Sequence, residues 1–495
     1  MHSLFVLFAL FTLEPDTPEF NAVITRGLEE IYHLKFDRAD ACFDSLIIAA
    51  PGHPAGYYFK ATSCFYQIIS CSNPLITEKV FMDWNDRTIA VAEVQADPMI
   101  NDFYRGTAYG NIARYHVVNG DFLRAFYYAR KSKSLHEDIL KRDPENYDAY
   151  LTVGVYNYYA SALPQWMGLV AGLLGLGGDR DKGIEQLETA FHKGRIAGIE
   201  ASFVLANVYY EEGNYEKSLD YYDRLIRRFP DNYFLHNQKG VLLFSMEHFS
   251  EAKSVFLNAY DMAPARMPAS RLFSAYYLGR IYKLENNYPK AIDFFEEAVA
   301  LSEKQKLFKS INAWLPGSAE YQCGECYELA GDRPTAESHY RAAREHPLST
   351  KSIVQAATNR KAFKLSVFET EVMRARHLVL FGRTDEGYQL LERLQPKATG
   401  DYERFLAQIN YYMGRVLFKR EAFDSALEAF KKALEEISSD EDWRRPSATF
   451  YSGLCYLKLG EKEPARRAFK EVLKSDGYTD SARLHFRSKS YLSGL

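Results

Sequence analysis

The sequence has little of what defines several large classes of protein. Six cysteines in 495 residues are too few for a scaffold held together by disulfides. No stretch reaches the roughly 18 consecutive apolar residues that a membrane-spanning helix needs. Lysines and arginines total 61 against 65 aspartates and glutamates, which gives a net charge of −4. This balance gives no support for nucleic acid as the main partner.

Motifs for catalysis are also missing. The chain has no His-Glu-x-x-His helix and no Gly-x-Ser-x-Gly turn, and its 12 histidines are scattered. The glycine-rich run before Gly183 lacks the serine or threonine that follows the lysine in a phosphate-binding loop. Cys323 and Cys326 form a single CxxC pair on an expected helix, without the second pair typical of a zinc site. We therefore expect no enzyme activity, no cofactor and no metal, and we interpret these cysteines as packing residues.

One pattern is present throughout, and it is clearest near the middle of the chain. Gly240 is followed by Ala252, Phe256 and Pro264, in a unit of roughly 34 residues. Two antiparallel helices approach closely only where the side chains are small, here at Gly240 and Ala252. Phe256 then fills the space beside the crossing, and Pro264 ends the second helix because it lacks an N–H donor.

The same intervals recur along the chain. Glycine, alanine and an aromatic residue follow one another at this spacing in Gly27, Ala39, Phe43; Gly279, Ala291, Phe295; Gly324, Ala336, Tyr340; Gly414, Ala426, Phe430; and Gly453, Ala465, Phe469. This ladder resembles the tetratricopeptide-repeat superfamily over the whole chain after about residue 20. The resemblance implies an all-α fold, a right-handed superhelix of about ten helical pairs, and a scaffold without catalytic activity.

The N-terminus begins with an apolar run of ten residues, 4–13. A run of this length fits the hydrophobic region of a signal peptide, although no lysine or arginine precedes it and no clear small-x-small cleavage site follows. The alternatives are a buried first helix or a misassigned start. We expect an exported protein, periplasmic or associated with the envelope, with a cytoplasmic location as the alternative.

The repeats suggest a division of the chain. The second unit should place helices over about 55–70 and 83–96, with Asp97 and Pro98 ending the latter. The expected segments are a leader over 1–19, divergent repeats over 20–197, a regular array over 198–346, a joining helix over 347–366, a second array over 367–477 and a capping tail over 478–495.

The fourth unit contains an insertion, Leu163–Gly178, that is apolar and rich in glycine. Gly154 marks the crossing before it, and the second helix should not begin until about Asp179. Trp166, Leu169, Val170 and Leu173 would share one face of a short helix. We expect this helix to be wedged against the repeats, although a role in binding a partner or lipid remains open.

A narrower resemblance rests on the same unit. The segments Gly154-Val-Tyr-Asn157-Tyr, Leu163-Pro164 and Leu174–Gly183 resemble the signature of the tetratricopeptide repeat protein 39 family, a eukaryotic family of adaptors. Similar sequences occur in bacterial proteins that begin with a signal peptide. The apolar N-terminus of this chain departs from the eukaryotic family and favours an exported bacterial relative.

Repeat proteins of this kind bind an extended peptide or a helix along the surface made by the first helices. Positions offset by about −3, +1 and +4 from each crossing glycine should face that surface, where aromatics supply contact area and Arg or Asn bind backbone or carboxylate groups. We predict a protein or peptide partner there, with packing between repeats as the alternative for each residue. The predicted positions are Tyr158, Phe203, Asn207, Tyr210, Asn237, Phe244, Tyr276, Arg280, Tyr411 and Arg415.

A second hypothesis is a solenoid that binds a lipid or another small apolar ligand through the insertion, with peripheral membrane contact. If the insertion folds back into the superhelix, the scaffold hypothesis is favoured. If it projects as an exposed apolar hairpin, the lipid hypothesis is favoured. The sequence leaves the oligomeric state open.

Overall fold

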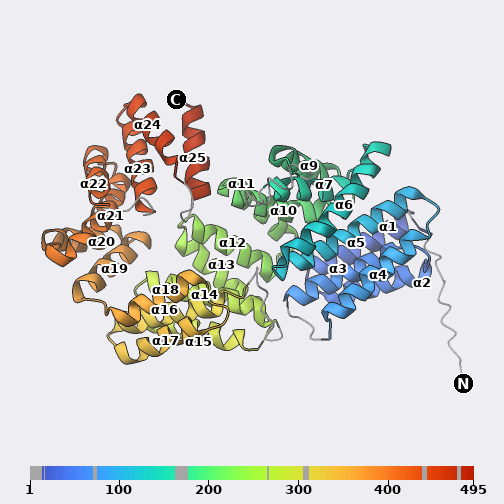
Figure 1. The fold of residues 1–495 in the computed structure, drawn as a ribbon, viewed down its shortest axis with the longest axis horizontal. Helices are drawn as coiled ribbons and strands as arrows, with labels where there is room; N and C mark the ends of the chain where they lie inside the picture. The colour runs from blue at the N-terminus through green and yellow to red at the C-terminus, as the bar shows by residue number, and fades with distance from the viewer. Residues whose placement is uncertain are drawn as a thin grey trace, which may run out of the picture. The chain divides into compact units, whose positions relative to one another are not determined.

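The computed structural model describes residues 14–15, 17–70, 75–161, 177–264, 267–304, 312–437, 443–475 and 481–495. Every regular element in these ranges is helical (Figure 1). Eleven pairs of consecutive helices are present in the described ranges, and α18 and α25 stand outside the pairs. The predicted all-α repeat fold is confirmed.

Contacts divide the chain into two units. Unit 1 comprises residues 1–205, 225–232 and 308–311, so α10 and α11 contribute to both units. Its helices are α1 (Pro18–Tyr32), α2 (Phe36–Ala49), α3 (Ala55–Ser70), α4 (Glu78–Glu93), α5 (Pro98–Val118), α6 (Phe122–Arg142), α7 (Ala149–Ser161), α9 (Arg180–Lys193), and parts of α10 (Gly198–Glu211) and α11 (Tyr215–Arg228).

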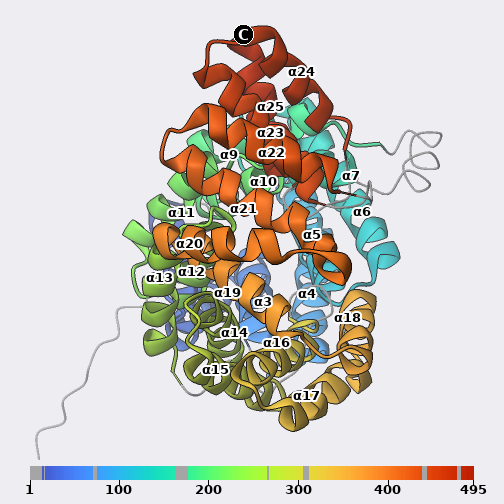
Figure 2. The same cartoon turned by 90° about the vertical axis from the view of Figure 1, so that its left-hand side faces the viewer.

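Unit 2 comprises residues 206–224, 233–307 and 312–495. Figure 2 shows its later helices, from α19 to α24, stacked one pair after another. The helices are α12 (Tyr233–Ser245), α13 (Phe249–Met262), α14 (Pro268–Leu284), α15 (Tyr288–Ser302), α16 (Leu315–Ala330), α17 (Arg333–Glu345), α18 (Lys351–Ala362), α19 (Val367–Leu380), α20 (Thr384–Leu394), the 3-10 turns η1 (Gln395–Lys397) and η2 (Gly400–Phe405), α21 (Leu406–Lys419), α22 (Phe423–Glu435), α23 (Arg444–Lys458), α24 (Lys462–Val472) and α25 (Ser481–Ser493).

The predicted crossing of glycine and aromatic ring is present in the regular repeats. A Cβ atom added at Gly240 would lie 2.7 Å from the ring of Phe256, and the same holds for Gly279 and Phe295. Phe256 and Phe295 are fully buried. Glycine at these positions lets the ring of the second helix pack directly on the backbone of the first, which fixes the geometry of each pair.

The fourth pair, α7 and α9, uses a closer crossing. A Cβ at Gly183 would lie 2.6 Å from the backbone nitrogen of Tyr158, and one at Gly154 would lie 3.0 Å from the carbonyl oxygen of Gly183. Backbone therefore packs on backbone here, without an intervening ring. Asp179 accepts a hydrogen bond from the N–H of Lys182 and begins α9 where the sequence predicted.

One expected boundary is wrong. The second helix of the second pair, α4, runs over 78–93 and not 83–96. Thr77 caps its start by accepting a hydrogen bond from the N–H of Val80. Asp97 and Pro98 do not end this helix but begin α5, because Asp97 caps the N–H of Met99 and proline fits the first position of a helix.

Unit 1 is held together by contacts far apart in the sequence. Glu200 of α10 accepts hydrogen bonds from the hydroxyl groups of Tyr32 (2.6 Å) and Tyr66 (2.7 Å) and from Arg114 (2.7 Å). Asn232 donates to the carbonyl oxygen of Tyr32 at 2.6 Å. The first helices α1, α3 and α5 thus converge on one carboxylate of the fifth pair.

Unit 2 also brings its beginning and end together. Arg483 of α25 donates to the carbonyl oxygen of Ser245 at the end of α12, at 2.9 Å. Asn286, in the turn after α14, lies 2.9 Å from Nδ1 of His377 on α19. These contacts join α12 to α25 and the turn after α14 to α19, although 238 and 91 residues separate the partners.

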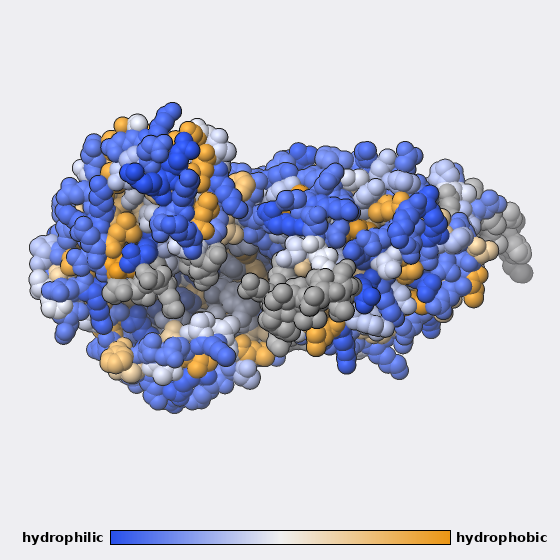
Figure 3. Space-filling model, turned by 45° about the horizontal axis from the view of Figure 1, so that its top comes forward, coloured by the Kyte–Doolittle hydropathy of each residue, from blue (hydrophilic) through white to orange (hydrophobic). Residues whose placement is uncertain are grey.

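Among the described helices, none combines the length and the apolar character needed to cross a bilayer. Hydrophilic residues cover most of the face shown in Figure 3, and hydrophobic residues form scattered spots on it. The apolar run 4–13 and most of the insertion, residues 162–176 with Trp166, Leu169, Val170 and Leu173, lie outside the described residues. The predictions for both segments therefore stay predictions.

Candidate functional site

Four of the ten predicted binding positions are buried among neighbouring helices. Asn237 donates hydrogen bonds to the carbonyl oxygen (3.0 Å) and the hydroxyl (2.9 Å) of Ser270, so it links α12 to α14. Tyr276 packs edge-to-face on Trp314 and on Phe295. These positions join adjacent repeats. The four buried positions are Tyr158, Asn237, Tyr276 and Tyr411.

The other six predicted positions are half-buried: Phe203, Asn207, Tyr210, Phe244, Arg280 and Arg415. Asn207 accepts a hydrogen bond from the hydroxyl of Tyr222 at 3.1 Å. Tyr210 stacks on Tyr215 and its hydroxyl lies 3.1 Å from Oγ of Ser245. Most of these half-buried positions gather around the C-terminal end of α12.

Both predicted arginines lie at this place in unit 2. Arg280 of α14 lies over the ring of Phe244, with 4.3 Å between the guanidinium carbon and the ring centre. Arg415 of α21 binds Glu247 through both terminal nitrogens, at 3.1 and 2.5 Å, and its guanidinium lies 5.5 Å from the ring centre of Tyr451. A two-point grip of this kind is the geometry with which arginine holds a carboxylate.

Glu247 occupies a strained position in the turn between α12 and α13. Its φ is +63°, whereas the corresponding turns after α10 and α23 have glycine, Gly213 and Gly460, at φ of +75° and +82°. A residue with a side chain costs about 1 kcal/mol in this conformation.

Further positive charges surround Glu247. Burial raises the pKa of this carboxyl group, but Arg415, Arg483 and Arg376 outweigh it and hold the pKa below its ordinary value. Nε of Arg376 is buried and has no hydrogen-bond acceptor. We call these three arginines, together with Arg280 over the ring of the neighbouring Phe244, the arginine cluster.

Sequence reasoning missed Glu247, Arg376 and Arg483. In the sequence, the turn that contains Glu247 can be recognised only as a short connection between two helices, without a glycine. Its partner Arg415 lies 168 residues away. Arg376 is on α19, next to His377, whose bond to Asn286 aligns α19 with α14. The spacing of residues within one repeat does not show which distant helices are in contact, because that depends on the curvature of the array.

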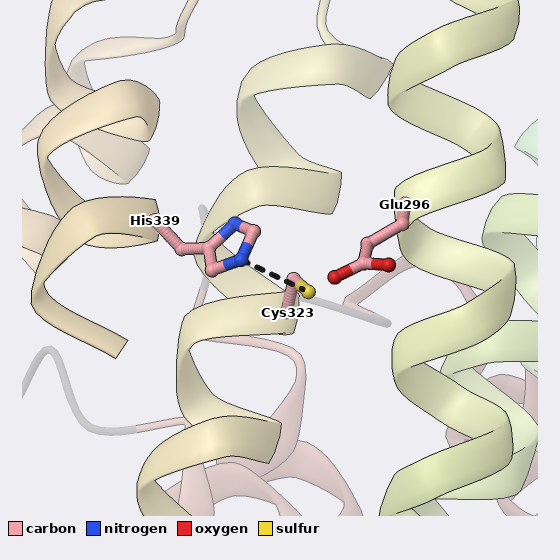
Figure 4. A group of neighbouring side chains, drawn as sticks. All are labelled: Glu296, Cys323 and His339. Carbon is pink, nitrogen blue, oxygen red and sulfur yellow. Dashed lines mark hydrogen bonds between the residues drawn. The ribbon is translucent and has the colours of Figure 1, made fainter. Parts of the chain in front are cut away.

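A second group of polar side chains lies on α15, α16 and α17. Figure 4 shows Glu296, Cys323 and His339 pointing toward one another, and their potential ligand atoms all lie within 4.8 Å. Nε2 of His339 is 3.8 Å from Sγ of Cys323, while its Nδ1 is 2.7 Å from Glu320. Glu296 accepts a hydrogen bond from Tyr327 at 2.8 Å.

These groups already satisfy one another. Burial first, and then the neighbouring Cys326, Glu296 and Glu320, raise the pKa of the Cys323 thiol well above its ordinary value. Cys323 and Cys326 are both buried in α16, as the packing interpretation requires. We assign no metal to this group.

Comparison with known proteins identifies the repeats. The tetratricopeptide repeat model matches residues 199–232, 276–307 and 447–476, which fall on α10–α11, α14–α15 and α23–α24. The chain therefore contains tetratricopeptide repeats in these three segments. No curated protein matches it.

Solved structures of other repeat proteins are similar to this chain at low identity. Yeast Tom70 is 12% identical, with 92% of this chain and 99% of that chain covered and a TM-score of 0.33. A human IFIT1 dimer with m7Gppp-AAAA is 16% identical, covering 93% and 96%, with a TM-score of 0.29. A tetratricopeptide repeat protein from Parabacteroides merdae is 15% identical, covering 58% and 96%, with a TM-score of 0.25. Similarity at these values carries no information about a ligand of this chain.

Proposed function

We propose that this repeat protein is a non-catalytic scaffold that binds a segment of a protein partner at the C-terminal end of α12 in unit 2. The observation that carries the proposal is the half-buried surface formed there by Phe244, Arg280 and Arg415. Aromatic and arginine side chains dominate the binding energy of protein interfaces, because they combine large contact area with several donors. Repeat arrays present such residues from successive helices along a continuous surface.

The setting of this interaction is a further part of the proposal. The apolar run 4–13 supports an exported protein, in the periplasm or on the envelope. N-terminal sequencing of the protein from its native host tests this part. Loss of the first dozen or so residues is expected, and an intact Met1 would contradict it.

A photo-crosslinking experiment tests the binding site. We suggest placing benzoylphenylalanine at Phe244, in the proposed surface, and at the exposed Asn258 of α13 as a matched control. In the native host, the proposal expects discrete crosslinked protein bands from position 244 and none from position 258. Equal crosslinking at both positions, or none at position 244, would contradict a partner at this surface.

A further inference from the structure

The arginine cluster contains more positive charge than its protein neighbours neutralise. Glu247 is bound by Arg415. Within the described residues, Arg280 and Arg376 form no ion pair with any carboxylate, although both are half-buried. Arg376 lies near Glu247, but Arg415 already binds that carboxylate and Arg483 also lies near it. A further anion from outside would therefore stabilise these half-buried guanidinium groups.

The nearby acidic residues are engaged elsewhere. On α19, Glu369 pairs with Arg360 (2.9 Å) and Glu371 with Arg374 (3.1 Å). Glu325 of α16 pairs with Lys283 of α14. Glu285, which follows α14, pairs with Lys253 at 2.6 Å. The elements that carry Arg280 and Arg376 therefore offer them no spare carboxylate.

Aromatic rings hold three of the four arginines in place. Arg280 lies on Phe244, Arg415 beside Tyr451, and Arg483 lies 5.4 Å from the ring centre of Tyr215. A ring supports the face of a guanidinium group and leaves its N–H edge available for hydrogen bonds. The cluster is therefore pre-organised, and a ligand loses less entropy on binding to it.

We propose that the arginine cluster binds carboxylate groups of an acidic segment in the partner protein. Arg415 already grips the carboxylate of Glu247 at two points, so Glu247 shows which chemical group the surface fits. Arg280 and Arg376 supply two further guanidinium groups for side-chain carboxylates. This inference rests on the proposed function, since it specifies the chemistry of the segment that binds at α12.

An acidic peptide fits these observations better than nucleic acid does. A nucleic-acid strand needs a track of cations that follows its backbone, whereas the unneutralised arginines here are confined to one place. The whole chain is also slightly acidic, with a net charge of −4, so it would repel a polyanion outside this surface.

Fluorescence anisotropy with two short labelled peptides tests the inference. One peptide alternates Glu with Gly, and the other has Gln in place of each Glu. The full chain should bind the Glu peptide, with affinity that falls as salt rises. Arg376→Gln and Arg280→Gln should each weaken this binding about tenfold. Arg393→Gln, at an exposed position on α20, should leave it unchanged.

The substitution Glu247→Gln gives the sharpest outcome. Glu247 competes with the ligand for Arg415, so its neutralisation should strengthen binding of the Glu peptide about tenfold. A purely structural role for Glu247 would instead weaken binding or leave it unchanged. A melting temperature for each variant, measured alongside, identifies a variant that fails to fold.

The remaining outcomes separate the two proposals. Equal binding of the Gln and Glu peptides would overturn the carboxylate inference and leave the scaffold proposal standing. Crosslinking at Phe244 without binding of either peptide would have the same meaning. Tighter binding of a single-stranded oligonucleotide or of inorganic phosphate, with the same dependence on Arg376, would overturn the assignment to an acidic peptide. An absence of both crosslinking and peptide binding would overturn both proposals.

Discussion

Each unit of this repeat protein places one glutamate among residues that the chain brings together from distant helices, and the two clusters differ in charge balance. Glu200 in unit 1 is bound by one arginine, Arg114, and by two tyrosine hydroxyls. Glu247 in unit 2 is bound by Arg415 and also lies near Arg376 and Arg483. The first cluster is neutral and complete, whereas the second retains positive charge. Under our proposal, a glutamate bound by distant helices closes unit 1, whereas in unit 2 the same arrangement leaves positive charge available for a partner.

The largest expected effect concerns one helix crossing in each unit. Gly183→Leu in unit 1 should cost about 3 kcal/mol of unfolding free energy, because its side chain would meet the backbone of α7, which cannot move aside. Gly240→Leu in unit 2 should cost about 2 kcal/mol, since it meets the ring of Phe256. Denaturant titration measures both. A greater loss for Gly240→Leu would contradict the difference between backbone and ring contacts.

Acid should affect unit 1 through His136. Burial lowers the pKa of this side chain to about 4 in the folded protein, below its ordinary value of about 6.5. The unfolded chain therefore takes up the proton first, and the stabilising effect of neutral His136 is present above about pH 6.5 and is lost as pH falls toward about 4. The loss should reach about 2 kcal/mol near about pH 5. His136→Asn should remove this part of the pH dependence, and an unchanged pH profile would contradict it.

Neutralising the two glutamates compares the clusters directly. Glu200→Gln should cost about 2 kcal/mol, because it leaves half-buried Arg114 without a counter-charge and weakens two tyrosine hydrogen bonds. Glu247→Gln should cost about 1 kcal/mol or less, since its side chain is 37% exposed and water screens the pair.

A soluble Glu-containing peptide should restore the stability of Glu247→Gln but not that of Glu200→Gln. Thermal unfolding with and without the peptide measures this difference. Restoration of both variants would contradict the distinction between a closed cluster and an open one.

The smallest effect concerns Arg376 itself. Arg376→Gln should stabilise unit 2 by about 0.5 kcal/mol, because it removes one of the several arginines near Glu247 whose positive charges repel one another. It should also raise the pKa of His377, which is held low by burial and then by Lys283 and Arg376. NMR titration of the His377 ring measures the shift. A destabilised variant would indicate that Arg376 has a structural role.

Much of the fold followed from local spacing. The interval between Gly240 and Phe256 predicted a crossing that the structure confirms, and helix α3 lies where the sequence placed it. The boundary at Asp97 and Pro98 was wrong because the same two residues suit the end of one helix and the start of the next. Where two helices follow each other closely, a proline does not show whether it ends the first helix or begins the second.

The candidate site was only partly predictable. Arg280 and Arg415 were found because they stand at fixed offsets from their crossing glycines. Tyr276 and Tyr411 stand at similar offsets yet are buried, since the next first helix covers that side of the repeat. Offsets locate a face of one helix but do not show how much of that face its neighbour covers.

The sequence by itself determined the helical pairs, the glycine crossings and the aromatic rings that fill them, because these depend on contacts within one repeat or between adjacent repeats. Only the tertiary structure decided which distant residues meet. Arg415 reaches Glu247 across 168 residues and Tyr32 reaches Glu200 by the same number. Small rotations between successive helical pairs add up along each unit. The residues of a single repeat do not determine this sum, so they do not show which distant residues will be in contact.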